Sequence, residues 1–284
     1  MRTLATRPDR LLSVVFAVWA VAAPTGGAGE AELRPETLAA WNTYVQTTER
    51  RVEQELAAPE GFLVLDFQPP DRRAGDRRAV MRGDVVVESM ETRDASGGQI
   101  DIPSGTVQHW RGAVLLGGVS LDALMAALES GDTLRGQQDV LDWRILERGP
   151  GRMRVFLRLQ RESIVTVTYA TEHAVTYARR PGHAVSRSLS TRIAEIENAG
   201  KADEREKPPG QDRGFMWRLN AYWRYEETPD GVIAEVESLT LSRNIPLLAR
   251  PFIGIFVGRI ARESLERTLT GLRANLTTRR PPRL

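Results

Sequence analysis

The sequence predicts an α+β protein in which seven antiparallel strands pack against one long C-terminal helix. Two observations near the C-terminus carry this prediction. Residues Gly214–Glu227 and Val232–Arg243 alternate apolar and polar side chains on either side of a turn at Thr228–Gly231. After Pro251 the apolar spacing changes from two residues to about three and a half, which is typical of a helix. Two long strands followed by an amphipathic helix require that the helix lie across a sheet.

The apolar positions of the first strand and of the helix are regular. On the strand they are Phe215, Trp217, Leu219, Ala221, Trp223 and Tyr225. On the helix they are Phe256, Ile260, Leu265, Leu269, Leu272 and Leu276. We therefore expect each set to form one face, and the two faces to approach each other.

The remaining strands of the predicted sheet precede this segment. A strand at Thr106–Leu116 comes before a helix that begins after Ser120, a good N-cap residue. Four strands follow at short intervals, at Val140–Arg148, Arg152–Glu162, Ile164–Arg179 and Ala184–Asn198. Residues 199–213 are charged and contain two prolines, which predicts an exposed excursion. Short connections of this kind favour hairpins and an antiparallel sheet with one solvated face.

The N-terminal residues have the pattern of a secretory signal peptide. Three arginines precede the apolar run Leu11–Ala23, and small residues follow, with a cleavage site after Ala22 or near Ala28. We expect residues 1–22 to be removed and the protein to be periplasmic or secreted. An uncleaved N-terminal anchor is the alternative, although the apolar run is short for a membrane span.

Charge and cysteine content exclude several classes of function. Removing residues 1–22 takes three Arg and one Asp from 39 basic and 37 acidic residues, which leaves 36 of each. A balanced mature chain gives no reason to expect nucleic-acid binding. The absence of cysteine excludes disulfides and a thiol nucleophile, and suits a periplasmic protein with a core of this size. The sequence does not indicate an oligomeric state.

Residues 23–105 form an N-terminal extension before the predicted sheet. A helix is expected at Leu33–Ala57, with Trp41 and Tyr44 on its apolar face. Short strands are expected at Gly61–Phe67, Asp84–Thr92 and Ile100–Ile102, and an exposed loop at Pro69–Gly83, which is rich in Arg, Asp, Gly and Pro. The expected division is therefore a signal peptide (1–22), the extension (23–105), one sheet-and-helix domain (106–276) and a tail (277–284).

Three local runs and the order of elements resemble a known superfamily. The runs are 186–195 (SRSLSTRIAE), 215–225 (FMWRLNAYWRY) and 260–265 (IARESL). Together with the element order they make Thr106–Leu276 similar to the START-like helix-grip superfamily, also called SRPBCC, which contains polyketide cyclases and lipid-transport proteins. The similar runs are those of uncharacterised exported bacterial members. Residues 33–105 lie outside the resemblance. One departure concerns Glu129–Gln138, which lacks the aromatic and proline residues expected near the mouth of a cavity.

The resemblance implies a curved sheet wrapped around the C-terminal helix, with an apolar cavity between them. We expect its lining to include residues from the sheet and from the last helix: Met153, Val155, Leu157, Tyr169, Arg192, Trp217, Leu219, Trp223, Tyr225, Phe256 and Ile260. For the aromatic residues, ordinary core packing against the helix is an equally good interpretation. Arg192 with Glu195 and Glu197 would hold a ligand carboxylate or phosphate inside a cavity, or form a surface ion pair.

The leading hypothesis is an exported protein that binds a hydrophobic small molecule or lipid, with transient membrane contact as a further expectation. An enzyme of the cyclase or aromatase kind is an alternative, and would need a cavity-facing acid or base such as Tyr169 or Tyr222. A structural or interaction module with a filled core is the third. The three histidines, His109, His173 and His183, have no metal-ligand spacing, and no catalytic motif or cofactor site is evident.

Overall fold

The computed structural model describes residues 32–135, 137–162, 166–244 and 250–277, without the side chains of Glu162 and of residues 250–260. It confirms the α+β prediction. The long strands are β2 (Gly105–Gly117), β3 (Val140–Gly149), β4 (Arg152–Glu162), β5 (Thr166–Arg180), β6 (His183–Glu197), β8 (Arg218–Thr228) and β9 (Gly231–Arg243). They pair antiparallel in the order β2-β9-β8-β6-β5-β4-β3. These are the seven strands that the sequence predicts, and two short strands add to them.

The short strands lie at the margins of the sheet. Strand β1 (Val86–Ser89) pairs with β2 and forms one edge, so that β1 and β3 are the two edges and the sheet is not closed. Strand β7 (Arg205–Glu206) pairs with β6 inside the predicted excursion. The segment Ile100–Ile102, expected as a strand, forms none, and only an isolated bridge joins Arg93 to Gln99 nearby.

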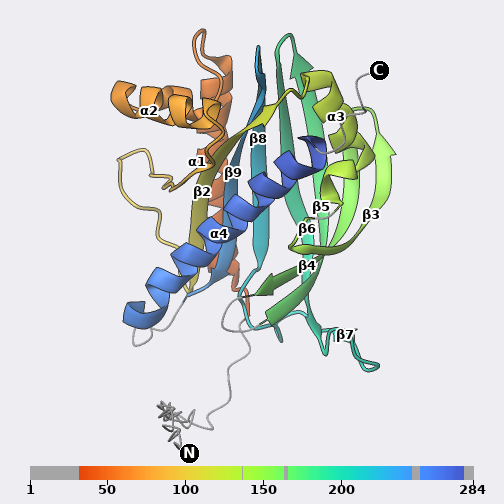
Figure 1. Ribbon diagram of the computed structural model, residues 1–284. Coiled ribbons are helices and arrows are strands. Elements are labelled where there is room, and N and C mark those ends of the chain that lie inside the picture. The colour runs from red at the N-terminus through yellow and green to blue at the C-terminus, as the bar shows by residue number, and fades with distance from the viewer. Residues whose placement is uncertain (1–31, 136, 163–165, 245–249, 278–284) are drawn as a thin grey trace, which may run out of the picture.

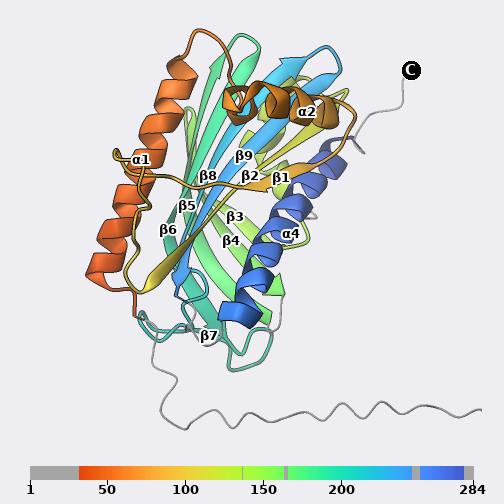
Figure 2. The same cartoon turned by 90° about the vertical axis from the view of Figure 1, so that its left-hand side faces the viewer.

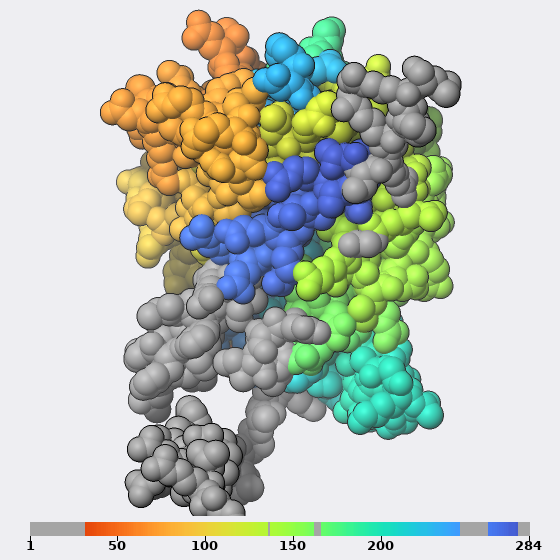
Figure 3. All heavy atoms as spheres, viewed as in Figure 1, coloured from red at the N-terminus to blue at the C-terminus, as the bar shows by residue number. Residues whose placement is uncertain are grey.

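The sheet curves around the last helix, as in a helix-grip fold (Figure 1). Helix α3 (Leu121–Ser130) follows β2, and its N-cap is Ser120, whose Oγ accepts a hydrogen bond from the N–H of Ala123 at 3.2 Å. Helix α4 (Arg250–Thr277) runs diagonally across the concave side of the sheet, with the N-terminal extension on one side and the α3–β3 region on the other (Figures 1 and 3). The short helix and the long C-terminal helix are thus confirmed.

The N-terminal extension covers the other, outer face of the same sheet (Figure 2). Helix α1 (Pro35–Ala57) brings Trp41 and Tyr44 onto Tyr222, Leu239 and Leu241 of β8 and β9. The sheet is therefore a middle layer between the extension and α4. This placement explains why strands β8 and β9 carry apolar side chains on both faces.

Two elements of the extension differ from the sequence prediction. The segment Gly61–Phe67 was expected as a strand, but its second half is the 3-10 helix η1 (Val64–Phe67). Its backbone N–H groups are taken by side chains, because the Asp66 carboxylate accepts from Phe62 and Leu63, and Glu235 accepts from Val64 and Leu65. A segment whose donors are satisfied in this way does not need a neighbouring strand.

The predicted loop Pro69–Gly83 is largely a helix, α2 (Pro70–Met81). Pro70 occupies the first turn, where its missing N–H costs nothing, and arginine has a good helix propensity. The helix has little apolar surface, with Val80 buried, and it docks by ion pairs such as Arg77 with Asp66 and Glu226. Because the contacts are ionic, no apolar stripe marks the helix in the sequence.

Ion pairs also bury the outer face of the sheet beneath the extension. Arg111 of β2, with 1% of its side chain exposed, bonds to Glu235 at 2.9 Å, Asp76 at 2.8 Å and Glu88 at 2.7 Å. Arg224 of β8 bonds to Glu55 of α1 at 2.5 Å and to the carbonyl oxygen of Phe62 at 2.9 Å. The outer face of the sheet is therefore not solvated. It is covered by a buried layer of ion-paired side chains that come from both the extension and the sheet.

Candidate functional site

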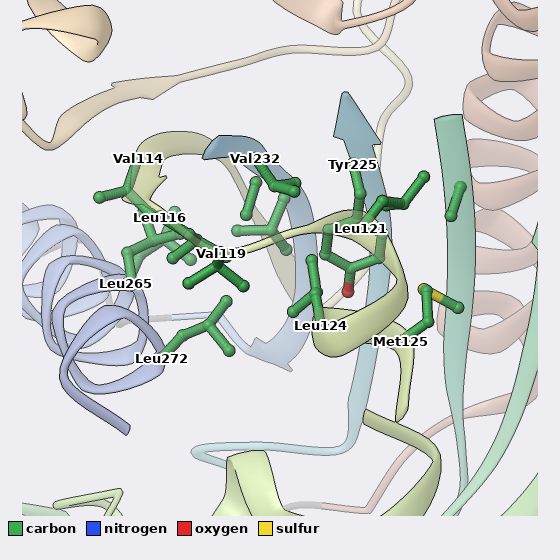
Figure 4. Close-up of a cluster of buried hydrophobic side chains, with 14 residues drawn as sticks. Val114, Leu116, Val119, Leu121, Leu124, Met125, Tyr225, Val232, Leu265 and Leu272 are labelled. Atoms are coloured by element: carbon green, nitrogen blue, oxygen red, sulfur yellow. The ribbon is translucent and has the colours of Figure 1, made fainter. Parts of the chain in front are cut away.

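The concave face of the sheet has a sealed half near α3. Val114 and Leu116 of β2 meet Leu265, Leu269 and Leu272 of α4 in one buried cluster, which α3 completes with Leu121, Leu124 and Met125 (Figure 4). The helix approaches β2 most closely at Gly112, where a Cβ atom would lie 2.6 Å from Cδ1 of Leu269. The C-terminal half of α4 is thus packed directly on the sheet, and this part of the interior is filled.

The other half of the concave face remains accessible to solvent. Its apolar members are half-buried, whereas on β2, β8 and β9 outward-facing neighbours such as His109, Tyr222 and Leu239 are buried beneath the extension. The accessible apolar side chains are Trp110, Leu157, Ile193, Leu219, Ala221 and Trp223. The described part of α4 packs mainly on β1 and β2, and Trp110, Ala221 and Trp223 lie at the margin of the sealed cluster. Half-buried aromatic and aliphatic groups on a concave surface are what a hydrophobic ligand site requires.

The structure distributes the predicted lining residues over both halves. Met153, Val155, Tyr169 and Tyr225 face the concave side and are buried by neighbouring side chains. Leu157, Leu219 and Trp223 lie in the accessible half, and Trp223 stacks on Tyr225 with ring centroids 5.9 Å apart. Phe256 and Ile260 belong to α4, but their side chains lie outside the described residues.

Trp217 lies on the opposite side of the sheet from the one predicted. It packs with Trp41 and Tyr44 of α1, and its indole N–H donates to Asp212 at 3.1 Å. Regular strand geometry begins only at Arg218, so the alternation through 219–225 does not extend back to Trp217. Phe215, expected on the same face, is exposed between the guanidinium groups of Arg213 and Arg243.

Arg192 also lies on the outer side. Strands β5 and β6 contain a bulge, because His173 pairs with Ser190 while Glu172 pairs with Arg192, which leaves Thr191 as the extra residue. An extra residue reverses the alternation beyond it, so Arg192 faces outward and forms an exposed ion pair with Glu206. Of the two alternatives, Arg192 thus forms a surface ion pair, but its partner is Glu206, whereas Glu195 pairs with Lys207 and Arg213 and Glu197 with Arg205.

The residues named for acid or base chemistry are separated by the sheet. Tyr222 faces outward, and its hydroxyl donates to Glu49 of α1 at 2.7 Å. Tyr169 faces inward, and burial raises the pKa of its hydroxyl. Glu195 is buried near Tyr169 but is already paired with Lys207 and Arg213, each at 2.8 Å. The structure does not bring Tyr169 and Tyr222 together into an acid–base pair.

Several polar side chains in or beside the accessible half, among them the buried His173, were not identified as site residues from the sequence. They come from four strands: Gln108, His173, Ser188, Ser190, Ser238 and Thr240, a set called the polar band below. Burial lowers the pKa of His173 to about 4, so its imidazole is neutral at physiological pH. Alternation within each strand indicates which of these side chains share a face. It does not show that they are neighbours until the register between the strands is known.

The described residues contain neither a metal-binding cluster nor a membrane-spanning helix. In the described ranges no group of three or more His, Asp or Glu side chains could hold a metal ion. No helix in the part of the chain that the structure describes is long and apolar enough to cross a membrane.

Comparison with known proteins yields structural likenesses only. No family model matches the sequence, and no curated protein is similar to it. Among solved structures, a STAR-related lipid transfer protein fragment from Xanthomonas axonopodis is 16% identical, with a TM-score of 0.44, over 67% of this chain and 98% of that chain. A START superfamily protein from Mycobacterium smegmatis is 12% identical, with a TM-score of 0.39, over 61% of this chain and 97% of that one. The Zhui aromatase/cyclase from Streptomyces sp. R1128 is 14% identical, with a TM-score of 0.37, over 61% and 96%.

The architecture is a helix grip. The strand order, the short helix after β2 and the long helix on the concave side establish this architecture from the chain itself. The low scores carry no residue role from these proteins to this chain. The N-terminal extension over the outer face is outside the helix-grip core.

Proposed function

We propose that this protein is exported and binds a hydrophobic small molecule or lipid between the concave face of its sheet and α4. The observation that carries the proposal is the contrast between the two faces of the same strands. On β2, β8 and β9 the outward side chains His109, Tyr222 and Leu239 are buried by the extension, whereas Trp110, Leu219 and Trp223 on the concave side stay half-buried. Apolar surface kept partly open in a concavity is a common feature of ligand sites.

Binding would work by enclosure. Each Å² of apolar surface removed from water contributes about 25 cal/mol before the costs of binding are subtracted. Because the C-terminal half of α4 is packed on β2, a ligand would enter by movement of the N-terminal half of α4 or of a loop at a strand end. Uptake or delivery of a lipid would then involve transient contact with a membrane.

The test uses Nile red, an uncharged apolar dye. It compares the binding of this dye by the wild type with its binding by a variant in which the site is filled. Ala221 lies at the centre of the accessible half, between Ser238 and Ser188 in the neighbouring strands. Ala221→Trp should abolish dye binding, while Thr176→Trp, on the exposed outer side of β5, should leave it unchanged. Circular dichroism and a thermal scan establish that both variants are folded.

Native material tests the same proposal without a dye. Protein purified from its own host should release an apolar compound into an organic extract, detected by mass spectrometry. The absence of any such compound together with the absence of dye binding would refute the binding function. The intact mass of the same material tests export, because removal of residues 1–22 or of a slightly longer leader shortens the chain at its N-terminus.

A further inference from the structure

The polar band crosses the accessible half of the concave face in two rows. In one row Trp110, Ser238, Ala221 and Ser188 are successive partners on β2, β9, β8 and β6. In the next row Gln108 pairs with Thr240, Thr240 with Leu219, and Ser190 with His173. The second row is continuous, because the N–H of Leu219 donates to Ser190 Oγ at 2.9 Å. Apolar and polar side chains thus alternate along the first row, and the second row is polar except for Leu219.

The band retains hydrogen-bonding capacity. Ser190 Oγ accepts from Leu219, which leaves its own hydroxyl hydrogen to donate. Gln108 Oε1 accepts from the indole N–H of Trp110 at 3.5 Å, a long contact. Among the described residues, no hydrogen bond is made by the hydroxyl groups of Ser238 and Thr240 or by the amide nitrogen of Gln108.

The orientation of His173 follows from its neighbours. The hydroxyl of Thr171 donates to the carbonyl oxygen of Leu157 at 3.1 Å, so its oxygen accepts from His173 Nε2 at 3.1 Å. The other ring nitrogen, Nδ1, is then an acceptor, and Ser188 Oγ lies 3.4 Å from it. This contact is weak by its length, and Ser188 is half-buried, so a ligand can compete for the Ser188 hydroxyl.

No member of the band carries a charge at neutral pH. The ionised side chains at the same level of these strands, Arg111, Arg187 and Glu237, point to the outer face and pair there with residues of the extension. On the concave side, nearer the strand ends, Glu195 is already paired with Lys207 and Arg213, and Arg161 of β4 with Asp139 and with Ser264 of α4. A ligand carboxylate or phosphate at the band would therefore lose its hydration without gaining a counter-ion from any side chain that the structure describes, which is strongly unfavourable.

We propose that the polar band selects an uncharged ligand, one whose apolar body carries a hydroxyl or carbonyl group that bonds to Ser188, Thr240 and their neighbours. This inference rests on the proposed binding function and specifies the ligand class. The polar band would recognise the polar group of the ligand, as a charged side chain does in a site for an anionic headgroup.

The test uses three ligands with the same twelve-carbon chain, dodecane, dodecan-1-ol and dodecanoate, which compete with Nile red at pH 8. Dodecan-1-ol should displace the dye at a concentration about tenfold or more below that of dodecanoate, because only the carboxylate is charged. The variant Ser188→Ala/Thr240→Val should weaken dodecan-1-ol about fivefold and leave dodecane unchanged. Thr176→Val, a threonine of the same type on the exposed outer side, should change neither.

The outcomes separate this inference from the binding function itself. Equal competition by dodecanoate and dodecan-1-ol would overturn the inference while the binding function stands. So would an unchanged affinity of the double variant for dodecan-1-ol, provided that dodecane still competes. If none of the three ligands displaces Nile red, or if Nile red does not bind, the proposed function fails and the inference fails with it.

Discussion

Replacing Gly112 by alanine should show how firmly the C-terminal half of α4 is held on the sheet. A Cβ atom at this position would lie 2.6 Å from Leu269 Cδ1 and 3.1 Å from Leu265 Cδ2, closer than side chains pack without a shift. Overpacking of this kind costs about 1–3 kcal/mol. Alanine also restricts the unfolded chain, which offsets about 0.5–1 kcal/mol. We expect Gly112→Ala to lower the free energy of unfolding by about 1–2 kcal/mol.

The same strand offers a matched control with the opposite sign. A Cβ atom on Gly117 meets nothing within 4 Å, so Gly117→Ala should raise the free energy of unfolding by about 0.5–1 kcal/mol. Urea unfolding followed by tryptophan fluorescence measures both variants. Leu269→Ala removes the clashing atoms, so its cost should be smaller by about 1–3 kcal/mol in the Gly112→Ala background than in the wild type. If Gly112→Ala and Gly117→Ala are equally stable, α4 does not pack on β2 as described.

Three further predictions concern the buried outer face. Bonds to His109 and Arg51 hold the pKa of Glu237 at about 2 despite its burial, below the ordinary value of 4.5. The contribution of the ionised Glu237 to stability is complete above about pH 4.5 and is lost as the pH falls toward 2. Between pH 5 and 2.5, the free energy of unfolding measured in urea should therefore fall by about 2–3 kcal/mol more for the wild type than for Glu237→Gln. Arg111→Met leaves Glu235 buried without its guanidinium partner and should lower the free energy of unfolding by about 3–5 kcal/mol in the same assay. As a control, Arg82→Ala removes an exposed ion pair with Asp84 and should change the free energy of unfolding by less than about 0.5 kcal/mol. Tyr44→Phe removes a hydroxyl that is hydrogen-bonded to His109 Nδ1 at 2.9 Å and accepts from the N–H of Thr92 at 2.8 Å. Thermal unfolding should therefore show a loss of about 1–3 kcal/mol in the free energy of unfolding, and an unchanged stability would contradict this buried connection.

Elements with a strong local pattern were predictable from the sequence. The alternation in β4 and β9, the Ser120 cap of α3 and the apolar stripe of α4 each depend on residues close together in the chain. Their order determines that a sheet of hairpins is followed by a helix that must cover it. The elements that the sequence missed, α2 and η1, are held by ion pairs and by the Asp66 and Glu235 carboxylates. Such contacts join distant residues and leave no period in the sequence.

The candidate site was predictable only where the strands are regular. Leu157, Leu219 and Trp223 face the concave side because an uninterrupted strand alternates strictly. Arg192 and Trp217 do not, because a bulge at Thr191 reverses the alternation and because regular geometry in β8 begins only after Trp217. A single extra or irregular residue therefore decides whether a side chain belongs to the candidate site or to the opposite face.

The sequence by itself determined the secondary elements of the helix-grip core, because periodicity and turn residues are local properties. Only the tertiary structure decided which face of the sheet is closed. Glu235 and Glu237 alternate with valine and alanine along β9, a pattern typical of a strand with one solvated face, yet both carboxylates are buried beneath the N-terminal extension. The extension binds there because arginine, histidine and glutamate side chains that are distant in the sequence neutralise one another.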